Sequence, residues 1–103
     1  MLEVIKVDTK HLVHFKNVRR LNCKNSEKVK KQLSPFVEKQ NSELTINLEG
    51  INFIDSSGFV TLISLLNTAN KNNCKLEISN VNSEVLELFE LLKLNDIFSL
   101  NQN

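Results

Sequence analysis

The alternation of short β-rich runs with longer amphipathic runs is the feature that most restricts how this chain can fold. Apolar residues recur at helical spacing in three stretches, which predicts helices over residues 26–39, 57–70 and 82–92. Short apolar and β-branched runs lie before and between these stretches and predict strands over 2–7, 12–18, 44–48, 74–78 and 97–100. Strands that alternate with helices pair in parallel through right-handed crossovers. The order therefore predicts an α/β fold with helices packed against the sheet.

The first two runs predict a different pairing from the rest. Residues 2–7 and 12–18 flank the polar residues 8–10, and this arrangement is typical of a β-hairpin. A hairpin pairs antiparallel, so we expect a mixed sheet that opens with it. Residues 51–54 are apolar as well, and we expect them to continue the strand at 44–48.

The predicted helix over 26–39 contains one residue that conflicts with it. Asn25 or Ser26 is suited to cap its start. Pro35, however, lies in the interior, where it removes a backbone hydrogen bond and clashes with the preceding turn. We therefore expect a kink or a break near Ser34.

Size and composition exclude several classes of protein. A chain of 103 residues with 41% hydrophobic residues suits one domain, which we expect to span 1–103, with any effector supplied in trans. Tyr and Trp are absent and no nucleic-acid motif is present, so we expect no direct nucleic-acid binding. No stretch of 18 apolar residues and no signal peptide is visible, which predicts a cytoplasmic protein without membrane insertion.

The sequence also lacks the patterns of metal sites and of common catalytic sites. His11 and His14 have no third ligand nearby, and Cys23 and Cys74 form no Cys-x-x-Cys pair, so we expect neither a metal nor a cofactor. Gly58 has no partner glycine to make a G-x-S-x-G elbow, and no P-loop is present. We therefore expect no catalytic residue and no enzyme activity.

The most informative segment runs from Ile54 to Gly58, with the sequence Ile-Asp-Ser-Ser-Gly. It lies where a strand region ends and a helix begins, which is where open α/β sheets tend to bind ligands. Free backbone N–H groups at a helix start favour anions, and a phosphate on Ser56 or Ser57 would add about −1.5 to −2 charges beside Asp55. The same residues also make an ordinary helix cap, and the residue pattern leaves both interpretations open.

The wider context resembles the STAS domains, which include the anti-sigma factor antagonists. Residues 47–59 (NLEGINFIDSSGF) are similar to the signature of this family. The strand at 75–78, the helix that starts at 82–89 and the closing segment 94–98 follow in the family's order. The resemblance implies a single STAS-like domain with a mixed sheet.

In the antagonist branch, the resemblance implies a phosphorylation switch at Ser56, with Asp55, Ser57 and Gly58 forming the environment of the phosphorylation site. The unphosphorylated form would bind an anti-sigma factor with serine kinase activity. A serine phosphatase acting on Ser56 would reverse the modification. We expect a monomer or a weak dimer.

One departure from the family concerns the partner surface. The family often has Gly-x-Leu-Asp before its first long helix, whereas this chain has Arg19-Arg20-Leu21-Asn22. We expect Arg19, Arg20, Asn22 and Phe59 to contact the partner. Two alternatives stay open: a constitutive STAS subunit of a lipid-transport ATPase or a signalling assembly, without a phosphorylation switch, and a small-ligand binder with an anion or nucleotide at the helix start.

Overall fold

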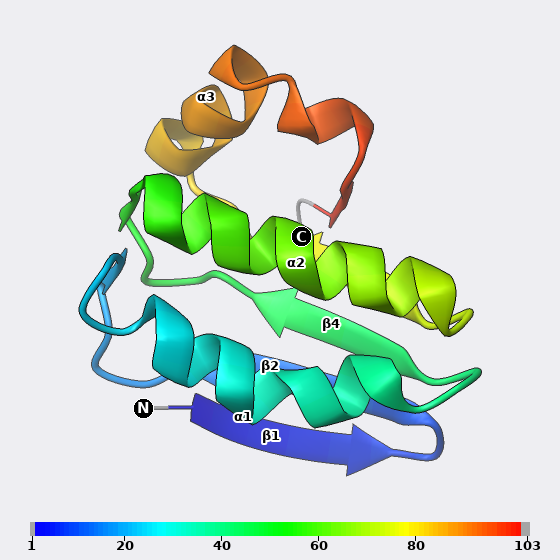
Figure 1. The fold of residues 1–103 in the computed structure, drawn as a ribbon. Helices are drawn as coiled ribbons and strands as arrows, with labels where there is room; N and C mark the ends of the chain where they lie inside the picture. The colour runs from blue at the N-terminus through cyan, green and yellow to red at the C-terminus, as the bar shows by residue number, and fades with distance from the viewer. Residues whose placement is uncertain (1, 102–103) are drawn as a thin grey trace.

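One mixed five-stranded sheet lies behind the two long helices in the view of Figure 1. The computed structural model describes residues 2–101. The strands lie in the order β1 (Leu2–Val7), β2 (Lys10–Phe15), β4 (Glu43–Asn47), β6 (Lys75–Ser79) and β7 (Ser99–Asn101). β1 pairs antiparallel with β2, and every other pair in this sheet is parallel. The predicted hairpin and mixed sheet are confirmed; residues 1, 102 and 103 of the expected domain lie outside the described residues.

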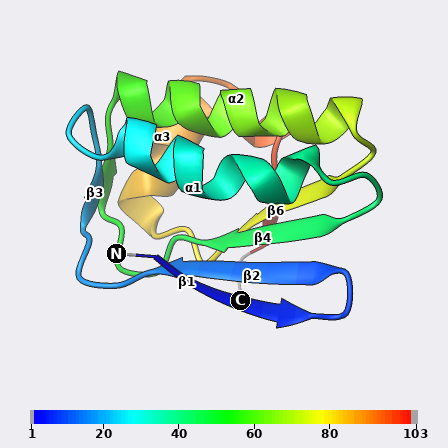
Figure 2. The ribbon, with the colours of Figure 1, turned by 60° about the horizontal axis from the view of Figure 1, so that its bottom comes forward.

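The two longest helices cover one face of this sheet. α1 (Ser26–Glu38) and α2 (Ser56–Lys71) lie side by side above β2, β4 and β6, as Figure 2 shows. Apolar side chains from both layers are fully buried between them, among them Leu33, Ile46 and Leu62. Removing these side chains from water is the main source of stability for a domain of this kind. The opposite face of the sheet is open, and Ile5 and Leu12 are exposed there.

A short third helix closes the C-terminal part of the fold. α3 (Ser83–Leu91) is followed by the 3₁₀ turn η1 (Leu94–Asp96), which leads back to β7. Phe89 of α3 packs edge-to-face on Phe59 of α2 and on Phe98, at centroid distances of 5.2 and 5.7 Å. This aromatic row attaches α3 to α2.

Two short strands form a second, separate sheet. β3 (Arg20–Leu21) pairs in parallel with β5 (Phe53–Ile54). The expectation that residues 51–54 continue the strand at 44–48 is therefore wrong. The chain turns after β4, where the N–H of Ile51 donates to the carbonyl of Leu48 and Gly50 adopts a φ of +87°. Glycine adopts such a left-handed conformation readily.

Pro35 does not divide α1. We expected a kink or break near Ser34, but the helix continues without interruption to Glu38. The carbonyl that loses its helical donor is that of Lys31, four residues before the proline. The Ser34 hydroxyl adds a hydrogen bond to the neighbouring carbonyl of Lys30 at 2.6 Å. Leu33 and Val37, on either side of the proline, are fully buried. Burial of these two side chains offsets the lost backbone hydrogen bond near the end of the helix.

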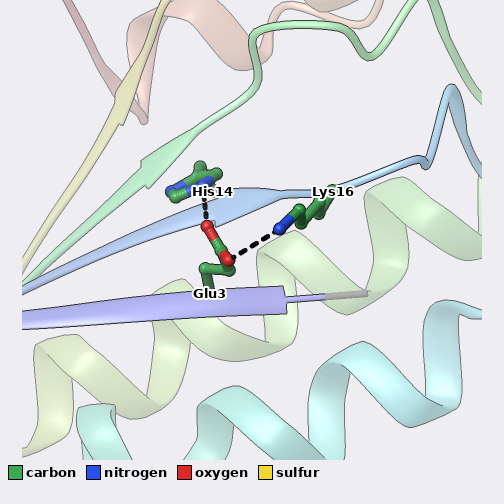
Figure 3. A network of polar contacts seen from close by, with 3 residues as sticks. All are labelled: Glu3, His14 and Lys16. Carbon is green, nitrogen blue, oxygen red and sulfur yellow. Dashed lines mark hydrogen bonds and ion pairs between the residues drawn. The ribbon is translucent and has the colours of Figure 1, made fainter.

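The two histidines lie on opposite faces of β2. His11 is buried under α1 against Phe36, whereas His14 faces the open side of the sheet. There, Glu3 accepts from His14 Nε2 at 2.7 Å and from Lys16 Nζ at 3.3 Å (Figure 3). The hydrogen bond from Lys16, and then that from His14, lowers the pKa of Glu3. Exposed pairs of this kind stabilise a fold only weakly.

Within residues 2–101, no three His, Cys, Asp or Glu side chains gather where they could hold a metal ion. In that same part of the chain, every helix is too short or too polar to cross a membrane.

Candidate functional site

The β3–β5 pair brings two distant parts of the chain to the start of α2. The N–H of Asn52 donates to the carbonyl of Arg19 at 2.8 Å, and the N–H of Asp55 donates to the carbonyl of Leu21 at 3.0 Å. These bonds hold the loop that precedes α1 against the turn that precedes α2. The two helices therefore begin next to each other.

Asp55 is the N-cap of α2 and connects these segments. Its carboxylate accepts from the Ser57 hydroxyl at 2.6 Å, from the N–H of Gly58 at 3.0 Å and from the N–H of Cys23 at 3.1 Å. The hydrogen bond from Ser57, followed by that from the Gly58 backbone, lowers the pKa of the Asp55 carboxyl. Asp55 is thus a carboxylate at neutral pH with several donors already bound to it.

The two serines of the motif have different surroundings. The Ser57 hydroxyl donates to Asp55, and its side chain is half-buried. Ser56 is exposed, and within the described residues its hydroxyl makes no hydrogen bond. Of the two hydroxyl groups, that of Ser56 is the one free to react or to contact another molecule.

Gly58 lets the first turn of α2 approach β3 and β5 closely. A Cβ atom at this position would lie 2.7 Å from Cγ2 of Ile54 and 2.8 Å from the carbonyl oxygen of Leu21. Real Cβ atoms are not found so close to backbone oxygen, so any larger residue would push α2 away. The glycine therefore sets the position of Asp55 and Ser56 relative to the loop before α1.

A groove of about 420 Å³ opens between the N-termini of α1 and α2. From the first helix and the loop before it, the groove is lined by Cys23, Ser26, Glu27 and Lys30. From α2 it is lined by Ser56, Ser57, Val60 and Thr61. The Thr61 hydroxyl donates to the carbonyl of Ser26 at 3.3 Å and joins the two helices. Ser56 is thus one of the residues that line this groove.

This arrangement and the sequence around it match a known family. The sequence model of the STAS domain matches residues 4–103. The chain belongs to the STAS domain family. The anti-sigma-B factor antagonist of Staphylococcus aureus is 29% identical to this STAS domain over 70 residues, which is 68% of the chain and 65% of that relative.

Solved structures share the fold of this STAS domain. An anti-sigma factor antagonist domain protein from Planctomyces limnophilus aligns over 99% of this chain and 90% of its own, with a TM-score of 0.89 and 14% identity. The Bacillus cell fate determinant SpoIIAA in its phosphorylated form aligns over 100% of this chain and 91% of its own, with a TM-score of 0.74 and 14% identity. At this identity the likeness concerns the fold, and it confirms the predicted α/β architecture.

The four residues expected at the partner surface of this STAS domain differ in exposure. Arg19 and Arg20 are exposed beside the site, and the Arg20 guanidinium lies 6.0 Å from the centre of the Phe53 ring. Asn22 is half-buried, and its side-chain oxygen accepts from the N–H of Lys24 in the turn before α1. The structure thus brings Arg19, Arg20 and Asn22 close to the start of α2.

Phe59 does not lie on that surface. It is only 4% exposed and packs on Phe89, so its expected contact with a partner does not fit the structure. The next residue, Val60, is 64% exposed and lines the groove. The helical spacing over residues 57–70 does not separate the two, because neighbouring residues at the edge of an apolar stripe are hard to distinguish by periodicity alone. Ser26 and Lys30 were likewise not expected at the site.

Proposed function

We propose that this STAS domain is a cytoplasmic anti-sigma factor antagonist whose partner binding is switched by phosphorylation of Ser56. The observation that carries the proposal is the free, exposed hydroxyl of Ser56 beside an Asp55 carboxylate that already has its donors. The name of the Staphylococcus aureus relative and the existence of a structural neighbour in a phosphorylated form support it.

The switch acts through charge and shape. An anti-sigma factor with serine kinase activity would transfer the γ-phosphoryl group of ATP to Ser56 Oγ, with release of ADP and the hydroxyl proton. The product carries about −1.5 to −2 charges next to the Asp55 carboxylate. A partner that accepts a neutral hydroxyl at this turn would then meet repulsion. A serine phosphatase would hydrolyse the ester and restore the serine and inorganic phosphate.

The partner would contact the exposed residues around this turn. Val60 offers the apolar contact that we expected of Phe59, and Arg19 and Arg20 offer positive charge on the adjoining loop. In this function the domain binds and is modified, and it catalyses no reaction itself.

The test is binding to the anti-sigma factor kinase of the source organism, measured by calorimetry with and without ATP. We expect the serine form to bind, and ATP to add one phosphate at Ser56 and release the complex. Ser56→Asp should weaken binding by a factor of ten or more. Ser83→Asp is the matched control, because Ser83 is the exposed first residue of α3 and follows an Asx cap as Ser56 does.

The alternative is a constitutive STAS subunit of a larger assembly. The observation that favours it is the exposure of Arg19 and Arg20 beside the site. It predicts that Ser56→Asp binds the partner as tightly as the unmodified protein does. Native protein that never carries phosphate at Ser56, by peptide mass spectrometry across growth and stress conditions, would also favour it over the switch.

A further inference from the structure

Ser26 is a mostly buried serine at the wall of the groove. It is only 6% exposed, and no hydrogen bond of its hydroxyl is found among residues 2–101. Ser42, which is also buried, instead donates to the carbonyls of Phe36 and Lys39. The Ser26 oxygen is not fully enclosed, since His11 Nδ1 is the one enclosed side-chain atom without a partner in the described residues. A hydroxyl that has no protein partner and keeps access to a groove can donate to a group bound there. The small exposed part of Ser26 lies in the groove that Ser56 borders.

Lys30 lies on the same wall of this groove. It is four residues after Ser26 in α1, so both side chains point from one face of the helix. Lys30 is half-buried and lines the groove together with Ser26 and Ser56. Its ammonium group carries three hydrogen-bond donors and a positive charge. The positive ends of α1 and α2 both lie at the same groove.

We propose that a phosphate on Ser56 is bound by this chain itself, in the groove between α1 and α2, where the Lys30 ammonium pairs with it and the Ser26 hydroxyl donates a hydrogen bond. The proposal rests on the proposed phosphorylation of Ser56. The modification would then do more than add charge, because the phosphate would fill the groove beside Val60 and deny it to the partner.

Two carboxylates oppose this binding. Glu27 lines the groove as well, and its carboxylate repels a phosphate. Asp55, the residue before Ser56, is also a carboxylate, although three neutral donors bind its oxygens. Lys30 should therefore favour phosphate binding and Glu27 should oppose it. Substitutions at these two positions of α1 should change the binding in opposite directions.

The experiment uses the full chain with phosphoserine incorporated at position 56 during translation, so that no kinase is needed. The second pKa of the phosphate, about 6 in free phosphoserine, is measured by ³¹P NMR titration. We expect it to lie below that value. Lys30→Gln should raise it by about 0.5 to 1, because an opposite charge nearby favours the dianion. Lys30→Arg should restore the low value, and Glu27→Gln should lower it further.

Two controls separate groove binding from general charge. Lys31→Gln removes the same charge from the exposed neighbour, which does not line the groove, and should leave the phosphate pKa nearly unchanged. Ser26→Ala should raise it by less than Lys30→Gln does. Circular dichroism checks that each variant folds. Equal effects of Lys30→Gln and Lys31→Gln, or no effect of either, would overturn the proposal.

The result is independent of whether a kinase modifies Ser56 in the cell. If the native protein carries no phosphate but the titration depends on Lys30, the proposed function fails and the groove contact holds. If Ser56 is phosphorylated in the cell but Lys30→Gln does not change the phosphate pKa, the proposed switch is retained and the phosphate is not bound in the groove.

Discussion

α2 and α3 begin in the same way but present different surfaces. Each follows an Asx cap, Asp55 or Asn82, whose side chain accepts from the N–H three residues later at 3.0 or 2.9 Å. Each then starts with an exposed serine, Ser56 or Ser83. Judged by the cap alone, the two helix starts are equivalent.

Their surroundings make the difference. Asp55 is charged and also accepts from Cys23 and Ser57, whereas Asn82 uses its amide nitrogen to donate to the carbonyl of Ile51 at 3.0 Å. The helix after Asn82 carries three exposed acidic residues: Glu84, Glu87 and Glu90. The comparison shows that a cap defines where a helix begins, and that the segments packed beside it determine whether the start can serve as a site.

Gly58→Ala should remove the close packing that distinguishes α2. The corresponding position of α3, Val85, already holds a buried side chain. We expect Gly58→Ala to lower the free energy of unfolding by about 3 kcal/mol, because the new methyl group would overlap Leu21 and Ile54. Urea denaturation measures this. The control is Gly50→Ala, where nothing lies within 4 Å and only the positive φ is strained, at about 1 kcal/mol. Equal losses would contradict this account.

Removing each cap in turn should show which one holds the loop before α1. Asn82→Ala should cost about 1 to 2 kcal/mol of unfolding free energy, because it removes the cap and the hydrogen bond to the Ile51 carbonyl. Asp55→Ala should cost more than Asn82→Ala, because it frees three donors: the N–H groups of Cys23 and Gly58 and the Ser57 hydroxyl. Amide hydrogen exchange at Cys23 should accelerate only in Asp55→Ala. Unchanged exchange there would mean that Asp55 does not hold the loop.

The two caps should also respond differently to acid. The hydrogen bond from Ser57, and then that from Gly58, hold the pKa of Asp55 below its ordinary 3.8. A lowered pKa stabilises the fold fully above 3.8 and loses that effect as the pH falls through the folded value. Asp55→Asn should therefore flatten the acid limb of stability against pH. Asn82→Asp should steepen it.

Urea midpoints between about pH 6 and about pH 2.5 measure this response. The stability of each variant is compared with that of the parent protein at the same pH. Contributions from Glu3 and His11, which are present in every variant, then cancel, and the contribution of the cap remains. Parallel curves for the parent and Asp55→Asn would contradict the prediction.

The smallest effect on stability is expected at the two serines themselves. Ser56→Ala and Ser83→Ala should each change the unfolding free energy by less than about 0.5 kcal/mol, because both side chains are exposed. Thermal denaturation checks this. A larger loss for Ser56→Ala would assign the Ser56 hydroxyl a structural role, and its effect on partner binding would then need a new explanation.

The sequence predicted the main sheet well but did not predict the pairing of β3 with β5. Period-two and helical patterns in runs of five or more residues specify strands and helices, and the hairpin and the parallel crossovers follow from their order. β3 and β5 have two residues each, which is too short for any period. Their pairing of Arg20 with Phe53 depends on contacts between distant parts of the chain.

The part of the site that lies in one continuous segment was predictable, but the residues that the fold brings to it from elsewhere in the chain were not. The motif indicated Asp55 and Ser56 directly, because a helix start is a local feature. Lys30 and Ser26 join them only because α1 and α2 begin side by side. The four-residue spacing of Ser26 and Lys30 does not identify them as groove residues. Lys24 and Lys28 have the same spacing and do not line the groove.

The position of β4 in the sheet has a consequence for local unfolding. β4 has neighbours on both sides, and its Leu44 and Ile46 are fully buried, whereas β1 has one neighbour and no buried side chain. We therefore expect fraying to start at β1 and protection of backbone amides to rise toward the centre of the sheet. The chain passes from β4 through one turn and β5 into α2. Ser56 thus follows a central strand, and we expect fraying of β1 to leave its presentation to a partner intact.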